Sequence, residues 1–344
     1  MSRLSEIPFS VLDLSPIAEG STAADALRNS LDLAQNAERL GYKRFWVAEH
    51  HSMPGIASAA TSVVIAHVGV GTSSIRIGSG GIMLSNHAPI VIAEQFGTLD
   101  ALFPGRVDLG LGRAPGSDGL TMRALRRRLD AADEFPDQLQ ELQYFLKTPV
   151  AGQKVQAVPG GGSDVEIWLL GSSDFNARLA GQLGLPFSFA AHFSPDNTLP
   201  ALEIYRENFR PSEVLDEPLA MVAVNIFAAA TDHEAEKLAT SQHQSFLNLI
   251  RGTPGKIQPP VDDMEAVWSP AEKALVQARL GGSIIGGPET VKHGLERLID
   301  ATNADEIIVN TMTFDHEARI VSYEIVSEIL KTNSAELSST AAIG

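Results

Sequence analysis

The sequence has no cysteine and comparatively little positive charge. Without cysteine, the 344-residue chain cannot form disulfides, use a thiolate nucleophile, or hold zinc or iron–sulfur clusters through sulfur. Lys and Arg number 26 against 42 Asp and Glu, which leaves a formal net charge of −16. A general nucleic-acid-binding protein needs a basic face to neutralise phosphates, so we expect no nucleic-acid partner.

Long hydrophobic runs are also missing. The stretch Ser52–Ile75 has no Asp, Glu, Lys or Arg, and it contains Pro54, His67 and three glycines. This composition is typical of a loop and a buried helix rather than of a membrane span. Near the start of the chain, Glu6 and Asp13 break up the short apolar run that a signal peptide would need. We therefore expect a cytoplasmic protein without membrane attachment.

The sequence does contain an alternation of short β-rich apolar runs with longer helical patterns. The segment Ala23–Leu40, for example, repeats its apolar residues at helical spacing. Several apolar runs are nearly continuous, as strands buried on both faces of a parallel sheet should be. Eight strands are predicted, at Ile7–Asp13, Arg44–Glu49, Ile75–Ile82, Arg106–Leu111, Glu166–Gly171, Phe187–Ala191, Leu219–Ala228 and Glu306–Thr311.

Eight strand–helix units favour an α/β fold of the closed (β/α)8 TIM-barrel type over an open doubly wound sheet. Two segments rich in proline or glycine interrupt the alternation. Thr148–Asp164 is expected as a loop insertion between strands 4 and 5, and Arg251–Asp263 as an irregular insertion between strands 7 and 8. We expect residues 1–332 to form a single domain, and residues 333–344, which are mostly small and polar, to form a flexible C-terminal tail.

In barrels of this type, active sites form at the C-terminal ends of the strands. The fifth strand ends in Gly171-Ser172-Ser173, and such a turn at the start of a helix offers N–H groups, hydroxyls and a positive helix end to a phosphate. The alternative is that a serine merely caps the helix. Arg113 follows the fourth strand, where its guanidinium can reach the same phosphate, and a salt bridge to Glu49 or Asp118 is the alternative.

Two further groups at the strand ends are open to more than one interpretation. The glycines of Gly110–Gly116 have the spacing GxGxxxG, not GxGxxG, so they do not predict a Rossmann dinucleotide site. Glu49, His50 and His51 invite a metal, but adjacent strand residues point to opposite faces, so we predict no metal site. One histidine facing the pocket as an acid or base is the preferred hypothesis, and a packed, hydrogen-bonded histidine is the alternative.

Several motifs, in their order and spacing, resemble the luciferase-like monooxygenase family, the flavin-dependent (β/α)8 barrels related to bacterial luciferase. They are KRFWVAEHH, IRIGSGGIMLSNHAP, PGRVDLGLGRAPG and IWLLGSS, while LAGQLGLPFSFAAHF and YRENFRPS resemble the single-chain bacterial members. The resemblance covers most of residues 7–330 and implies that FMN binds in the mouth of the barrel.

The resemblance also implies roles for individual residues. Glu49 and His50 fall where the family places a flavin-side acid and a catalytic histidine. Gly112 stands where luciferase itself has a reactive cysteine, which argues against a light-emitting reaction but not against oxygen chemistry. The cofactor-binding positions, including a non-proline cis peptide at Gly80-Gly81 and the phosphate contacts, are Gly80, Gly81, Arg113, Gly171, Ser172, Ser173 and Asn176.

The function implied by the resemblance is that of a flavin-dependent monooxygenase that uses reduced FMN and O2 on a small organic substrate. The chain has no good nicotinamide site, so a separate flavin reductase is the expected source of reduced FMN, and a homodimer is expected because relatives are often dimers. Three alternatives stay open: hydride transfer with a deazaflavin coenzyme, a flavin-binding protein without turnover, and a metal-dependent barrel hydrolase. The substrate does not follow from the resemblance.

Overall fold

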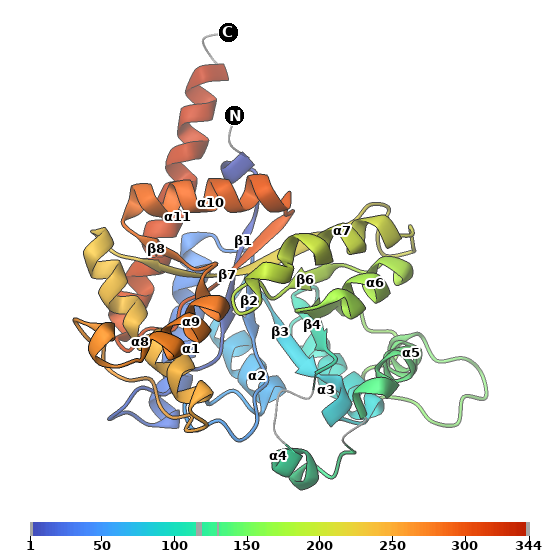
Figure 1. The fold of residues 1–344 in the computed structure, drawn as a ribbon. Helices are drawn as coiled ribbons and strands as arrows, with labels where there is room; N and C mark the ends of the chain where they lie inside the picture. The colour runs from blue at the N-terminus through green and yellow to red at the C-terminus, as the bar shows by residue number, and fades with distance from the viewer. Residues whose placement is uncertain (1–2, 115–118, 129–130, 342–344) are drawn as a thin grey trace.

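The computed structural model describes residues 3–114, 119–128 and 131–341. Its strands confirm the predicted TIM barrel, because eight parallel strands pair in a closed ring in the order β1-β2-β3-β4-β5-β6-β7-β9 (Figure 1). Each of the eight overlaps one predicted strand. They are β1 Phe9–Asp13, β2 Arg44–Val47, β3 Arg76–Met83, β4 Val107–Gly112, β5 Glu166–Gly171, β6 Phe187–Phe189, β7 Ala220–Ala228 and β9 Glu306–Asn310.

A short additional strand, β8 (Ile284–Gly286), is not among the predicted ones. It pairs with the end of β7, at Ile226–Ala228, outside the ring of eight. Only three residues long and flanked by glycine pairs, it is too short to show an apolar period in the sequence.

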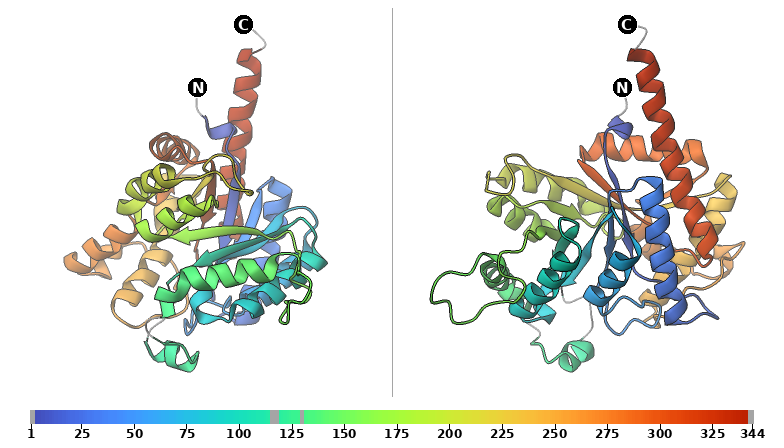
Figure 2. Two further views of the ribbon diagram at one scale, coloured as in Figure 1. Left: turned by 90° about the vertical axis from the view of Figure 1, so that its right-hand side faces the viewer. Right: turned by 180° about the vertical axis from the view of Figure 1, so that it is seen from behind.

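Helices follow most of the strands and surround the barrel (Figures 1 and 2). Helix α1 shows why they form where they do: Thr22 and Asp25 make a reciprocal capping box at its start, and Gly41 ends it in the left-handed region. The α-helices are α1 Ala23–Leu40, α2 Thr61–Gly71, α3 Pro89–Leu102, α4 Gly119–Ala124, α5 Phe135–Leu146, α6 Asp174–Leu183, α7 Thr198–Asn208, α8 Asp232–Ile250, α9 Pro270–Leu280, α10 Pro288–Thr302 and α11 His316–Ala341. The 3₁₀ turns are η1 Arg3–Ser5, η2 Leu84–Asn86, η3 Ala131–Glu134, η4 Pro195–Asn197 and η5 Met264–Ala266.

Both predicted insertions are present. Residues 148–164 form a loop between α5 and β5, and residues 251–263 are irregular between α8 and α9. Ile257 in the second insertion pairs with Ala18 in the loop after β1, so this insertion folds back over the C-terminal ends of the strands. The two termini lie at the same end of the molecule, and α4 lies at the opposite end (Figure 1).

The segment predicted as a flexible tail, residues 333–344, begins inside a helix, and its flexibility stays a prediction. Helix α11 continues to Ala341, so the backbone of residues 333–341 is helical, and residues 342–344 lie outside the described residues. Alanine, glutamate and leucine in this segment favour a helix, which an interpretation based on its polarity alone overlooks. Among the described residues, none of the helices is both long and apolar enough to cross a membrane.

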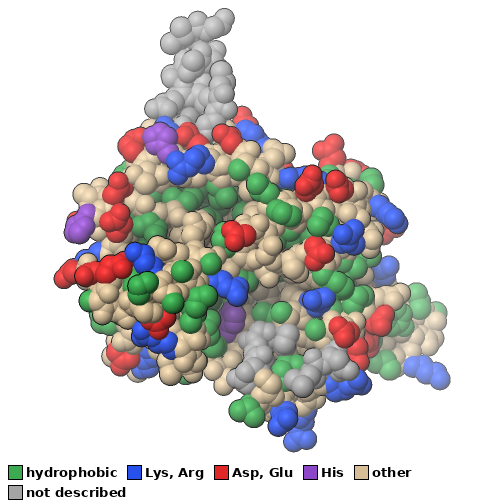
Figure 3. All heavy atoms as spheres, viewed as in Figure 1, with side chains coloured by type: hydrophobic (Ala, Val, Ile, Leu, Met, Phe, Trp, Pro, Cys, Tyr) green, Lys and Arg blue, Asp and Glu red, His purple; other side chains and the backbone are tan. Residues whose placement is uncertain are grey.

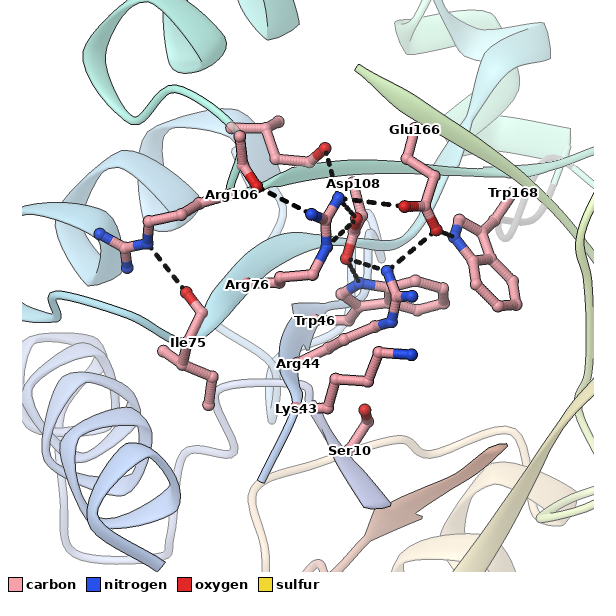
Figure 4. Close-up of polar contacts among 12 residues, drawn as sticks. Ser10, Lys43, Arg44, Trp46, Ile75, Arg76, Arg106, Asp108, Glu166 and Trp168 are labelled. Atoms are coloured by element: carbon pink, nitrogen blue, oxygen red, sulfur yellow. Dashed lines mark hydrogen bonds and ion pairs between the residues drawn. The ribbon is translucent and has the colours of Figure 1, made fainter. Parts of the chain in front are cut away.

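The N-terminal end of the barrel is filled by buried charges. Arg44 Nη1 lies 2.8 Å from an oxygen of Asp108 and 3.1 Å from one of Glu166. Its Nε lies 3.0 Å from Glu306, and Arg76 pairs with both Asp108 and Glu166 (Figure 4). Burial lowers the pKa of Arg44, but the surrounding carboxylates raise it overall, so it stays charged. Paired charges thus occupy this end of the barrel, whereas active sites of such barrels lie at the other end.

Above this charged layer the interior is apolar. The two tryptophans Trp46 and Trp168 meet edge to face, with ring centroids 5.4 Å apart. They form one cluster with Leu12, Ala48, Met221, Ala223 and Ile308. Since strand residues alternate between faces, the next inward positions toward the C-terminal end are two residues beyond these. Those positions line the mouth of the barrel.

Candidate functional site

Beside the mouth, strand β3 carries the cis peptide bond between Gly80 and Gly81 that the resemblance implies. Neither position has room for a side chain. A Cβ at Gly80 would come within 2.5 Å of Leu12 Cδ1, and one at Gly81 within 2.6 Å of the Gly110 carbonyl oxygen. The close approach of β3 to the neighbouring strand β4 and to the interior therefore requires glycine at both positions.

Glu49, predicted as a catalytic residue, is buried and bonded on both carboxylate oxygens. Its Oε1 lies 2.7 Å from His51 Nε2 and 2.8 Å from His87 Nε2, and its Oε2 accepts the backbone N–H of Met83 at 3.0 Å. Burial raises the pKa of Glu49, but the hydrogen bonds and charge of the two histidines lower it overall. An ionised Glu49 thus joins the loop after β2 to the segment after β3.

This cluster contains one residue that the sequence argument did not assign. His87, the residue directly after η2, reaches Glu49 from the segment that follows β3. The three ligand-type atoms of Glu49, His51 and His87 lie within 4.8 Å of one another, a set that suits a transition metal as well as a hydrogen-bonded network. In the sequence, His87 stands in the Asn86-His87-Ala88-Pro89 motif after the third strand. Its distance along the chain from Glu49 and His51 matches no metal-binding motif, so the sequence does not link the three residues.

His50 lies at the mouth together with His192, which follows β6. Burial lowers the pKa of His50 below its usual value. Burial and the nearby His50 lower the pKa of His192 to about 3, so His192 is neutral at physiological pH. His50 is thus a partly buried neutral imidazole that can accept a proton, which fits the acid–base hypothesis.

Arg113 stands at the end of β4, beside the start of α6. Its guanidinium carbon lies 4.1 Å from the ring centroid of Phe175, and its carbonyl accepts the Ser85 hydroxyl at 3.3 Å. Within the described ranges no carboxylate pairs with Arg113, so the expected alternative of a bridge to Glu49 does not occur. Asp118, the other proposed partner, lies outside the described residues.

The start of α6 has the features of an open anion site. Ser173 is the N-cap residue, but its side chain makes no cap hydrogen bond, so the capping alternative is not realised. The amide of Asn176 donates to the Leu170 carbonyl at 2.5 Å, which leaves its buried Oδ1 without a partner among the described residues. The carbonyls of Gly171 and Ser172 are both occupied, by Ala190 N–H and the Ser194 hydroxyl.

The predicted site residues therefore form two groups at the mouth of the barrel. Arg113 with Gly171, Ser172, Ser173 and Asn176 surrounds the α6 start, while Glu49 and His50 belong to the β2 side. The η2 segment joins the groups, because Ser85 binds the Arg113 carbonyl and the neighbouring His87 binds Glu49. The space-filling view shows a hollow on this face, with a histidine exposed at its wall (Figure 3).

Comparison with known proteins agrees with this architecture. The family model described as luciferase-like monooxygenase matches residues 7–304. A luciferase-like monooxygenase of Escherichia coli (strain K12) is 52% identical over 94% of this chain and 97% of its own. The N-acetyl-S-alkylcysteine monooxygenase of Bacillus subtilis (strain 168) is 34% identical over 94% of this chain and 98% of its own.

Solved structures share the fold. Apo-MsnO8 has a TM-score of 0.83 at 34% identity and covers 94% of this chain and 98% of its own. The oxygenating component of 3,6-diketocamphane monooxygenase from Pseudomonas putida, solved in complex with FMN, has a TM-score of 0.71 at 18% identity. The match covers 95% of this chain and 97% of that one. An F420-dependent secondary alcohol dehydrogenase has a TM-score of 0.70 at 15% identity, and the match covers 94% of this chain and 99% of that one. The last two are alike in fold alone.

Proposed function

The chain belongs to the luciferase-like monooxygenase family, and we propose that it is a flavin-dependent monooxygenase that uses reduced FMN and O2 on a small organic substrate. The observation that carries the proposal is the position of Arg113, held over Phe175 beside an α6 start whose N-cap Ser173 is unused. A guanidinium and free helix N–H groups together are a strong binding arrangement for a phosphate.

The described residues fit the cofactor at two places. Arg113, Ser172, Ser173 and the helix N–H groups would hold the phosphate, and the ring would lie beside the Gly80-Gly81 segment, where the packed interior leaves no room for a side chain. The unpartnered Asn176 Oδ1 fits a polar ligand near the same helix start. Reduced FMN, when bound, would supply the two electrons and two protons that convert one atom of O2 to water, while the other oxygen atom enters the substrate.

The chain's own residues position the substrate and move a proton. His50, neutral through burial, accepts or returns a proton at its ring nitrogen during turnover. Glu49 stays ionised and keeps His51 and His87 in place, which holds the wall of the site together. The closed, charge-filled N-terminal end of the barrel keeps bulk water from entering from below.

Two partners belong to the proposal. A separate reductase supplies reduced FMN, because the sequence has no nicotinamide-binding pattern. A second copy of the chain covers helix α2, which contains no charged residue although Val63 and Val70 are 67% and 81% exposed. The same exposed stripe of α2 also carries His67, so the contact would include one imidazole between the two valines. Helix α2 packs beside α3, where Leu102 is also exposed.

The test is a visible absorbance titration with FMN and, separately, with F420, followed by oxygen uptake with reduced FMN. The substrate panel contains an aldehyde, a ketone and N-acetyl-S-methylcysteine, the last because of the activity named for the Bacillus subtilis relative. We expect FMN to bind and one substrate to raise oxygen uptake. Binding of F420 but not of FMN would support the deazaflavin alternative instead. Binding of FMN without turnover of any substrate would support the alternative of a non-catalytic flavin-binding protein.

Two controls sharpen the test. The variant His50→Ala is expected to bind FMN normally but to turn over more slowly, whereas His293→Ala on exposed α10 should change neither. Metal analysis of the purified protein is expected to find none bound at Glu49, because its oxygens already accept hydrogen bonds from both histidines and from the backbone. A stoichiometric metal that is needed for turnover would favour the hydrolase alternative.

A further inference from the structure

A group of buried side-chain amides lies between β7, β9 and helix α8, and the proposed proton transfer does not use it. Asn225 and Asn310 sit opposite each other in register on β7 and β9. They are two residues beyond Ala223 and Ile308, which belong to the apolar interior, so they are the next inward positions toward the mouth. Gln242 joins them from α8, and all three are nearly inaccessible to solvent.

Asn225 is the centre of the group and is saturated with hydrogen bonds. Its Oδ1 accepts from Asn310 Nδ2 at 2.8 Å and from Gln242 Nε2 at 3.2 Å. Its Nδ2 donates to the His192 carbonyl at 2.6 Å and to the Ser283 hydroxyl at 3.3 Å. An asparagine amide has two donor hydrogens and an oxygen with two lone pairs, so Asn225 has nothing left to offer a ligand.

The neighbours of Asn225, in contrast, keep unused acceptors. Asn310 Oδ1, Gln242 Oε1 and His192 Nδ1 are buried and have no hydrogen-bond partner within the described part of the chain. Because buried polar atoms are nearly always paired, three such atoms around one centre indicate that a bound group completes them. His50 is near enough to contribute to the lowered pKa of His192, so the group lies near the proposed proton acceptor.

We propose that Asn310, Gln242 and His192 form a subsite that binds an uncharged hydroxyl or amide N–H of the substrate, with Asn225 as the residue that positions them. The inference rests on the proposed function, since it assigns a substrate class to that site. The free atoms are two amide oxygens and one ring nitrogen, and an N–H or O–H satisfies the oxygens directly. A cation is disfavoured, because a buried charge would need a carboxylate, and the near one, Glu49, is already occupied by two histidines.

The test compares two probes in which a hydroxyl donor is present or is blocked by methylation. Benzyl alcohol and benzyl methyl ether are titrated into protein whose Asn and Gln side chains carry ¹⁵N, and the shifts of the side-chain amide signals are followed by NMR. We expect the alcohol to bind about tenfold more tightly, as one unmade hydrogen bond to buried acceptors implies. The shifted signals should include those of Asn225, Asn310 and Gln242.

The variant Gln242→Met should reduce this preference, while Gln244→Met, which lies on the same helix and contacts the Pro259 carbonyl instead, should retain it. Equal affinity for the two probes, no binding of either at saturating concentration, or shifts confined to other amides would overturn the subsite. FMN binding is measured in the same samples. Intact FMN binding with no donor preference rejects only this inference, whereas loss of FMN binding by the native protein rejects the proposed function.

Discussion

The guanidinium of Arg113 lies over the ring of Phe175, with its carbon 4.1 Å from the ring centroid. Arg113 directly follows strand β4, and Phe175 is the second residue of α6, the helix after strand β5. The contact therefore joins two neighbouring strand–helix units. Stacking on an aromatic face limits the rotamers of a flexible arginine. The positive charge is therefore held beside the α6 start before any anion binds.

Removal of this charge should weaken cofactor binding. The variant Arg113→Ala is expected to lose FMN affinity by about tenfold to a hundredfold, the range of a charge-assisted hydrogen bond. Arg178→Ala is the control, because Arg178 lies further along α6 and donates to Asn208. Fluorescence quenching of FMN gives both affinities. An unchanged affinity in Arg113→Ala contradicts the phosphate assignment.

An acidic residue at the same helix start should have the opposite effect. Asp174 is the first residue of α6 and is exposed, so its carboxylate repels a phosphate bound there. Asp174→Asn is expected to tighten FMN binding by about twofold to fivefold at low salt, and less at high salt because exposed charges are screened. Asp216→Asn, an exposed acid in the loop before β7, should change nothing. Weaker binding by Asp174→Asn would contradict the prediction.

The neutral His192 should make the folded protein sensitive to acid. Its pKa is about 3 in the folded state against about 6.5 in an unfolded chain, so as the pH falls below about 6.5 the unfolded chain takes up the proton first. The free energy of unfolding is therefore lost between about pH 6.5 and 3, by up to about 2 kcal/mol at pH 5.

Urea unfolding at pH 7 and at pH 5 measures this loss. In His192→Asn the difference between the two pH values should be smaller than in the native protein. The matched control His293→Asn, on exposed α10, should behave like the native chain. An equal loss in native protein and in His192→Asn would show that the acid sensitivity has another source.

The exposed valines of α2 provide a test of self-association. Val63 and Val70 are one heptad apart and lie on the same side of the helix. Lysine at both positions places charge in the proposed contact between copies, so the double variant Val63→Lys/Val70→Lys should be monomeric by light scattering where the native protein is dimeric. Val214→Lys/Leu275→Lys, also exposed but elsewhere, is the control. A monomeric native protein contradicts the proposed dimer.

The barrel could be predicted because its signals are local. Runs such as Glu306–Thr311 are apolar and β-branched, and helices such as Ala23–Leu40 repeat their apolar residues at helical spacing. Strand β8 was missed because three residues between glycines show no period. The helical continuation of α11 was missed because polarity says little about whether a backbone stays helical.

The site was predicted in part. The turn after β5 and Arg113 could be found because each follows a strand, and the ends of parallel strands meet at one rim. The contact of Phe175 with Arg113 and the hydrogen bond of His87 to Glu49 were not predicted, because no sequence motif indicates either interaction. The group around Asn225 joins His192, which follows β6, with Gln242 on α8 and Asn310 on β9, and no sequence spacing relates these residues.

The sequence by itself determined roughly where the eight barrel strands lie, which polar residues follow them, and that no cysteine ligand exists, because composition and periodicity act along the chain. Only the tertiary structure decided which of those polar residues share an atom-to-atom contact. Closure of the barrel brings Asn225 and Asn310, 85 positions apart, to within 2.8 Å. Hydrogen bonds depend on tenths of an ångström, which are set by the packing of whole strands and helices rather than by any one segment.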